Sequence, residues 1–206
     1  MEHLTKLFKL AELTRSQIQN GYALSGIPKD QISTLAEHQY LVTFMAWQLA
    51  RNANYAGANL NVEKVMEQAL THDLGELFGG DIATPYALVN PRAKKFAKAF
   101  EAENHKFFSK FFGPDKNHFK KLSAEIMNAK TDEALVAKLA DYVECTHFKL
   151  YTTKRFGKRD LAIARLKCYG YVKKMKDKVA KQALTKFVDG WIKELPKATP
   201  WISLTP

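Results

Sequence analysis

Cysteine and long hydrophobic runs are what this sequence has least of. Its 206 residues include only two cysteines, Cys145 and Cys168, which lie far apart. Two isolated thiols are typical of a reducing compartment and argue against a disulfide scaffold. No apolar run approaches the roughly 20 residues that a membrane-spanning helix requires. The N-terminal segment MEHLTKLFKLAEL is amphipathic, unlike a secretory signal. We therefore expect a cytoplasmic protein that does not associate with membranes.

Acidic residues are also scarce relative to basic ones. The chain has 21 aspartates and glutamates against 32 lysines and arginines, a net charge of +11. Residues 149–186 alone carry thirteen lysines and arginines and only two acids. Such a positive field attracts anions, although a solvated lysine-rich helix face would have the same composition. No zinc finger or aromatic platform accompanies the charge, so a small phosphorylated ligand is a better expected partner than nucleic acid.

Glycine and proline fall mainly between segments of helical periodicity, and no alternating strand pattern persists. The length and a hydrophobic content of 46% suit one domain with its own core. We expect a single all-α domain over residues 1–196 and an irregular tail over residues 197–206. The predicted helices cover residues 2–20, 34–52, 61–76, 91–112, 117–129, 131–153, 158–177 and 178–194.

Three of these helices carry ionisable residues on faces that are otherwise apolar. His38 begins a stripe that continues through Leu41, Val42, Met45 and Leu49. The stripe of helix 61–76 leads into His72 and Asp73. In helix 131–153, a row of alanines leads to Asp141. All four side chains are therefore predicted to point into the core.

Buried histidines and aspartates from separate helices are what a metal site in a helical bundle requires. Mixed nitrogen and oxygen ligands suit one divalent ion of the Mn, Fe, Co, Ni or Zn series, and suit Mg less well. The lack of thiolate partners argues against a structural zinc site. Four protein ligands on a six-coordinate ion leave room for water and substrate, which favours a catalytic centre.

The order H…HD…D resembles the HD-domain metal-dependent phosphohydrolases. The segments AEHQY (36–40), HDLGELFGGDIATP (72–85) and KLADYVE (138–144) are similar to the branch of bacterial 5′-deoxyribonucleotidases, in which a G-D-x-x-T-P loop follows H-D-x-x-E. The resemblance spans about residues 10–150. It implies a compact helical bundle with a core domain over about 30–150, on which helices of residues 155–195 pack. It also implies that His38, His72, Asp73 and Asp141 bind one divalent metal.

The same resemblance implies hydrolysis of a phosphate monoester by a metal-activated water. Glu76 matches the family's catalytic glutamate and Asp81 its catalytic loop aspartate. Glu76 follows His72 by four residues, so on a continuous helix its carboxylate would lie on the ligand face. Thr84 is expected to bind the substrate phosphate or to hold the loop.

One position departs from the family pattern. Related nucleotidases carry an arginine and a tryptophan before the first ligand helix, where this chain has Gly21 and Tyr22. We expect Tyr22 to contact the substrate. Glycine, however, has no side chain that could replace the paired hydrogen bonds of an arginine guanidinium group to phosphate. Arg15, Lys29 and Lys94 are candidates to supply the missing charge.

The leading hypothesis is a phosphohydrolase for a small phosphomonoester, most plausibly a (deoxy)nucleoside 5′-monophosphate. A phosphodiesterase or nucleoside triphosphate hydrolase on the same scaffold is one alternative. A nucleotide- or nucleic-acid-binding module with a vestigial HD site is another. The amphipathic helices after residue 155 are also expected to offer a homodimer seam, through Leu161, Leu166, Tyr169 and Val172.

Overall fold

A computed structural model describes residues 1–195, and almost all of their regular structure is helical. Its α-helices are α1 (Glu2–Ala11), α2 (Leu35–Tyr55), α3 (Val62–Thr71), α4 (Thr84–Val89), α5 (Pro91–Phe108), α6 (Lys116–Asn128), α7 (Asp132–Thr153), α8 (Lys158–Lys174) and α9 (Lys178–Glu194). Over these residues the only β pairing is an isolated bridge between Ile18 and Thr34. The all-α prediction is confirmed. The predicted irregular tail, residues 197–206, lies outside the described range.

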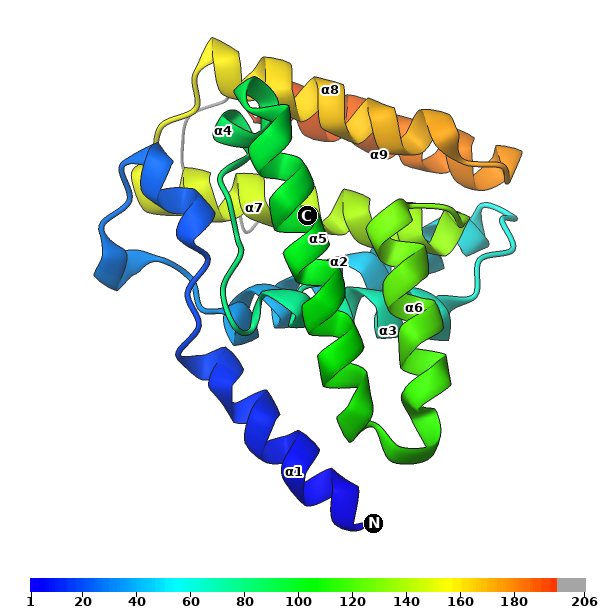
Figure 1. Cartoon of the computed structure of the whole chain (residues 1–206). Coiled ribbons are helices and arrows are strands. Elements are labelled where there is room, and N and C mark those ends of the chain that lie inside the picture. Colours follow the sequence, from blue (N-terminus) through cyan, green and yellow to red (C-terminus); the bar gives the residue numbers. More distant parts are fainter. Residues whose placement is uncertain (196–206) are drawn as a thin grey trace.

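Helices α2 and α7 form the centre of the fold. Helix α2 packs against α3 and α7, and α7 packs in turn against α8. Alanines such as Ala46 and Ala50 on α2 and Ala140 on α7 are fully buried in the main core, where small side chains let backbones approach closely. Figure 1 shows α8 and α9 across one end of the molecule, α5 across the front, and α1 leading away to the N-terminus.

Local signals in the sequence set where the two central helices begin. Thr34 and Glu37 form a capping box: the Thr34 hydroxyl accepts from the Glu37 amide, and the Glu37 carboxylate accepts from the Thr34 amide at 2.8 Å. Thr131 caps α7 by accepting from the Ala134 amide at 3.2 Å. His38 thereby lies one turn inside α2.

The first predicted helix is shorter than expected. It was predicted over residues 2–20, but α1 ends at Ala11 and a 3₁₀ turn, Glu12–Arg15, follows. The Thr14 hydroxyl donates to the Ala11 carbonyl at 2.7 Å, a local bond by which threonine competes with regular helix. A second 3₁₀ segment, Asn20–Ser25, then ends at a glycine with positive φ. This path buries Tyr22 and brings the Gly21 amide to the side chain of Asp81.

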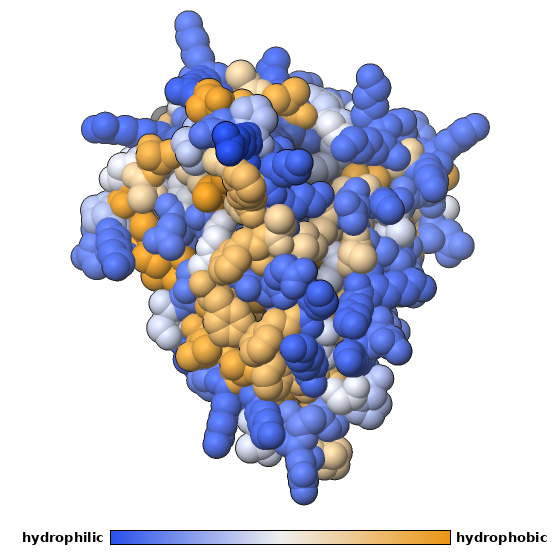
Figure 2. Space-filling view, in the orientation of Figure 1, coloured by the Kyte–Doolittle hydropathy of each residue, from blue (hydrophilic) through white to orange (hydrophobic). Residues whose placement is uncertain are grey.

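The surface features bear on two further predictions. Of the residues expected at a homodimer seam, Val172 is buried in the core whereas Leu166 is 65% exposed, and the dimer stays a prediction. Hydrophobic side chains instead gather in a band on the face that carries α4 and α5 (Figure 2), where Phe96, Phe100 and Phe107 are exposed. No helix within residues 1–195 is long and apolar enough to cross a bilayer.

Candidate metal centre

Four side chains from three separate segments meet in the core. Their ligand atoms all lie within 4.8 Å of one another. Nε2 of His38 is 3.3 Å from Nε2 of His72, 3.4 Å from Oδ2 of Asp73 and 3.5 Å from Oδ1 of Asp141. Both imidazoles are buried, and the carboxylates are mostly buried. The structure thus brings together the four residues that the sequence pattern singled out.

The chain leaves the helix at the His-Asp pair, which corrects the predicted helix over residues 61–76. Helix α3 ends at Thr71; His72 keeps helical dihedrals, whereas Asp73 has φ −107° and ψ 12°. Adjacent side chains on an α-helix diverge by about 100° and would not face one point. The turn removes that divergence. The Asn104 amide donates to the Gly75 carbonyl at 2.7 Å and holds the turn against α5.

Each histidine is oriented by a bond from its other ring nitrogen. Nδ1 of His38 donates to Oε2 of Glu144 at 2.5 Å, and Nδ1 of His72 donates to the Ala69 carbonyl at 2.7 Å. Because Nδ1 carries the proton in both rings, each Nε2 directs a lone pair into the cluster, as metal-binding histidines do. The contact of Glu144 with His38 was not predicted from the sequence pattern. The available signal was a glutamate three residues after Asp141 on a buried helix face.

The donor set fits a divalent cation. Two imidazole lone pairs and two carboxylate oxygens converge in a buried space, where acceptors facing one another are unfavourable unless a cation or protons lie between them. In the absence of a cation protons take that place: burial lowers the pKa of His72, but the Asp73 and Asp141 carboxylates outweigh burial and raise it to about 9. Mixed nitrogen and oxygen donors suit a mid-series divalent ion.

Glu76 and Asp81 lie beside this cluster, although Glu76 does not continue an α-helical face as predicted. It belongs to a 3₁₀ turn, Leu74–Glu76. Burial, Asp73 and Asp81 together raise the pKa of its carboxyl well above the ordinary value. Oδ2 of Asp81 accepts from the Gly21 amide at 2.5 Å, and a Cβ at Gly21 would lie 3.1 Å from both Asp81 oxygens. Glycine at position 21 therefore permits this close contact.

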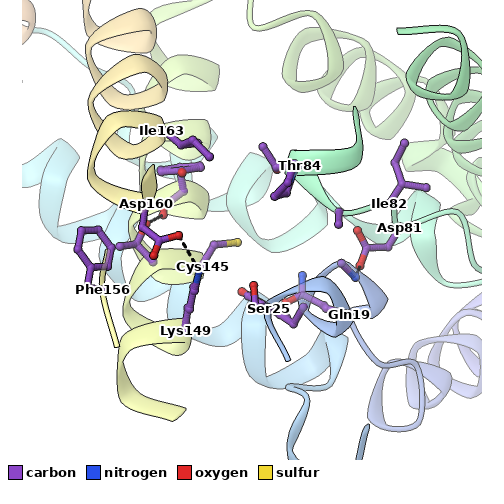
Figure 3. A pocket seen from close by; sticks show the side chains of 16 residues that line it. Gln19, Ser25, Asp81, Ile82, Thr84, Cys145, Lys149, Phe156, Asp160 and Ile163 are labelled. Carbon is purple, nitrogen blue, oxygen red and sulfur yellow. Dashed lines mark hydrogen bonds and ion pairs between the residues drawn. The ribbon is translucent and has the colours of Figure 1, made fainter. Parts of the chain in front are cut away.

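A cavity of about 150 Å³ adjoins the cluster, and the predicted substrate residues Tyr22 and Thr84 both line it. Figure 3 shows Cys145 and Lys149 of α7 and Asp160 of α8 on one side, and Asp81 and Thr84 on the other. None of the four cluster residues lines the cavity, but Sγ of Cys145 in its wall is 3.6 Å from Oδ1 of Asp141. On the same side as Cys145 (Figure 3), Nζ of Lys149 and Oδ1 of Asp160 form an ion pair at 2.6 Å.

Comparison with known proteins matches a family model described as HD domain to residues 13–184 of this chain. The chain belongs to the HD domain family. A protein of Vibrio vulnificus named 5′-deoxynucleotidase is 28% identical over 159 residues, which cover 75% of this chain and 79% of the relative. Another protein of that name, from Vibrio parahaemolyticus, is 30% identical over 134 residues, 64% of this chain and 68% of the relative.

The crystal structure of a Pyrococcus horikoshii protein has the same fold as this HD domain. It superimposes with a TM-score of 0.68 at 20% identity, over 93% of this chain and 99% of the other. Family membership and the histidine–aspartate cluster make the protein a metal-dependent phosphohydrolase.

None of the three candidates for the missing arginine lines the cavity of this HD domain. Arg15 donates to Glu12 at 2.7 Å, and its side chain is 75% exposed. Lys29 and Lys94 are exposed on the surface. Lys138 does not line the cavity either, but its Nζ lies 3.4 Å from Oδ2 of Asp141 in the cluster.

Two other histidines of the HD domain serve different contacts. His105 is buried in α5 beneath the turn at Gly75. Nε2 of His147 accepts a bond from the Trp191 indole at 2.8 Å. Neither belongs to the four-residue cluster.

Proposed function

We propose that this HD domain is a phosphomonoesterase that hydrolyses (deoxy)nucleoside 5′-monophosphates. The observation that carries the proposal is the convergence of four buried acceptors next to a cavity whose wall includes Tyr22, Asp81 and Thr84. The printed names of the bacterial relatives support a nucleotide substrate.

In this proposal His38, His72, Asp73 and Asp141 hold one divalent cation of the Mn, Fe, Co, Ni or Zn series. Such an ion, when bound, lowers the pKa of a water and neutralises charge on the phosphate. Its protein ligands stay aligned because Glu144 fixes the ring of His38. The cluster is closed to bulk water on the histidine side, since both rings are buried.

Glu76 is the proposed proton acceptor for the attacking water. Its carboxyl lies in a turn directly after the HD pair, and burial raises its pKa towards the range useful to a general base. Asp81 is held by the Gly21 amide through Oδ2, which leaves Oδ1 to orient the attacking water or a substrate hydroxyl. Thr84, at the start of α4, donates its hydroxyl to a phosphate oxygen.

The cavity suits the nucleoside part of the substrate. Tyr22, Tyr142 and Phe156 contribute aromatic surface on which a base can pack. The relatives that match this chain are named 5′-deoxynucleotidase, which favours a nucleoside 5′-monophosphate as the substrate. We therefore favour the monoester over the phosphodiester and triphosphate alternatives.

The test is release of inorganic phosphate from a panel of ribo- and deoxynucleoside 5′-monophosphates with Mn²⁺, Co²⁺ or Ni²⁺. Asp73→Ala and His72→Ala should abolish turnover, whereas His118→Ala should not, because His118 is exposed and pairs with Glu67. Unchanged activity in both cluster variants would refute the assignment.

Product analysis separates the alternatives. Inorganic phosphate as the product supports the monoesterase, whereas a nucleoside monophosphate or pyrophosphate would identify a diesterase or triphosphate hydrolase. A protein without turnover that retains nucleic acid with a steep salt dependence would instead be a binding module.

A further inference from the structure

Lys138 lies on the outer side of the metal centre. Oδ1 of Asp141 faces Nε2 of His38 at 3.5 Å, while its other oxygen, Oδ2, is 3.4 Å from Nζ of Lys138. One carboxylate therefore separates the ammonium group from the space between the histidines. The Lys138 side chain is 21% exposed, so its charge is largely shielded from bulk water yet reachable from outside.

Lys167 approaches the same carboxylate from the next helix. Helices α7 and α8 pack together, and Asp160 and Ile163 of α8 line the cavity (Figure 3). Lys167 follows Ile163 by four residues, so it lies one turn further along the same face. Lys167 does not line the cavity itself, but the charges of Asp141 and Lys138 act on it.

Lys167 lacks a counter-ion within residues 1–195. No carboxylate there forms an ion pair with it, since Asp160 pairs with Lys149 and Asp141 with Lys138. The side chain is half-buried, and burial and Lys94 lower its pKa although Asp141 opposes that shift. An anion bound between the two lysines would supply the missing charge.

We propose that Lys138 and Lys167 bind the phosphate group of the substrate and supply the charge that Gly21 cannot. The inference rests on the proposed function. Two ammonium groups and a divalent cation around one site favour a dianionic phosphate monoester over a diester with a single negative charge. Ammonium groups bind phosphate as point charges with rotatable donors, so an arginine fork is not needed.

The test uses the metal-loaded full chain with Lys138→Met and Lys167→Met, singly and together. Lys174→Met is the matched control, because Lys174 is an exposed lysine of the same helix as Lys167. Loss of a charge-assisted bond to phosphate should raise KM for the monophosphate about tenfold or more for each lysine. The affinity for the deoxynucleoside product, which lacks phosphate, should not change. Lys167→Arg, which keeps the positive charge, should raise KM for the monophosphate less than Lys167→Met does.

A merely structural role predicts a different pattern. If Lys138 only positioned Asp141, Lys138→Met would weaken Co²⁺ binding and leave KM for the monophosphate unchanged. Equal KM values in Lys167→Met and in the control would overturn the proposal even if the wild-type protein is an efficient monoesterase.

A second measurement does not depend on turnover. Inorganic phosphate should raise the Tm of the metal-loaded wild-type protein and of Lys174→Met, but not that of the double lysine variant. If no monophosphate is hydrolysed and this pattern holds, the proposed function fails while the phosphate site stands. If phosphate stabilises the double variant as much as the wild type, the phosphate site fails.

Discussion

Glu144 is the residue whose substitution tests the geometry of the metal centre most directly. Its carboxylate accepts the Nδ1 proton of His38 at 2.5 Å, and its side chain is 1% exposed. We consider Glu144→Leu, which removes the acceptor, and Glu144→Gln, which keeps an acceptor oxygen in nearly the same shape. The matched control is Glu103→Gln, since Glu103 is exposed on α5.

Two effects of Glu144→Leu can be estimated. Loss of a hydrogen-bond partner behind a metal ligand typically lowers metal affinity 10- to 100-fold, which is about 1.4 to 2.8 kcal/mol. The metal-free protein should also lose stability, because the Nδ1 proton of His38 is left buried without an acceptor, at about 1–3 kcal/mol. For a chain of this length, that loss lowers Tm by about 2–12 °C. Glu144→Gln should keep most of the metal affinity and most of the stability of the metal-free protein.

The assay is calorimetric titration of metal-free protein with Co²⁺, together with the visible spectrum of the bound ion and thermal unfolding. Glu144→Leu with wild-type Co²⁺ affinity, spectrum and Tm would show that Nδ1 of His38 needs no partner. The orientation argument for the whole cluster would then be wrong.

Three further predictions concern the metal, the turn at Gly75 and the Lys149–Asp160 ion pair. Removal of metal by a chelator should lower Tm by about 5–10 °C at a metal concentration of about 100 Kd, and Co²⁺ should restore it; an unchanged Tm would mean that no ion binds the folded state. Gly75→Ala places a Cβ 2.7 Å from the buried ring of His105 and should cost about 1–3 kcal/mol in urea unfolding. Gly190→Ala, with no atom within 4 Å of its Cβ, should instead be neutral or stabilising. Burial raises the pKa of Asp160, but the bond from Lys149 outweighs burial and lowers that pKa below 3.8. The Lys149–Asp160 pair therefore stabilises the fold above pH 3.8, and this stabilisation is lost as the pH falls through the folded pKa of Asp160. Asp160→Asn should therefore have a lower Tm than the wild type at pH 7, and the difference should shrink as the pH falls below 3.8.

Much of the fold was predictable from local patterns. The periodicity over residues 34–52 and 131–153 predicted helices close to the observed α2 and α7. The capping box at Thr34 marked a helix start, because its hydrogen bonds join residues only three apart. The order of His38, the HD pair and Asp141 also identified the family before any geometry was known, since three short segments in a set order carry that pattern.

The environment of those residues depended on tertiary structure. Apolar periodicity reports which face of a helix is buried, but not which neighbour covers that face. His38 and Glu144 are 106 residues apart, and Gly21 and Asp81 are 60 apart; both contacts exist only because distant segments pack together. The end of α3 at Thr71 was missed because the apolar pattern runs on past it.

Lys138 and Lys167 show the same difference between what local sequence predicts and what tertiary packing decides. From the sequence, Lys138 and Lys167 are two charges among 32 lysines and arginines. Lys138 lies three residues before Asp141 on α7, so their pairing is local. Lys167 comes near Asp141 only because α8 packs on α7. Residue types and their order determined which chemistry this chain can support. The packing of its helices decided where each charge lies relative to the metal ligands, because electrostatic energy depends on distance in space and on burial.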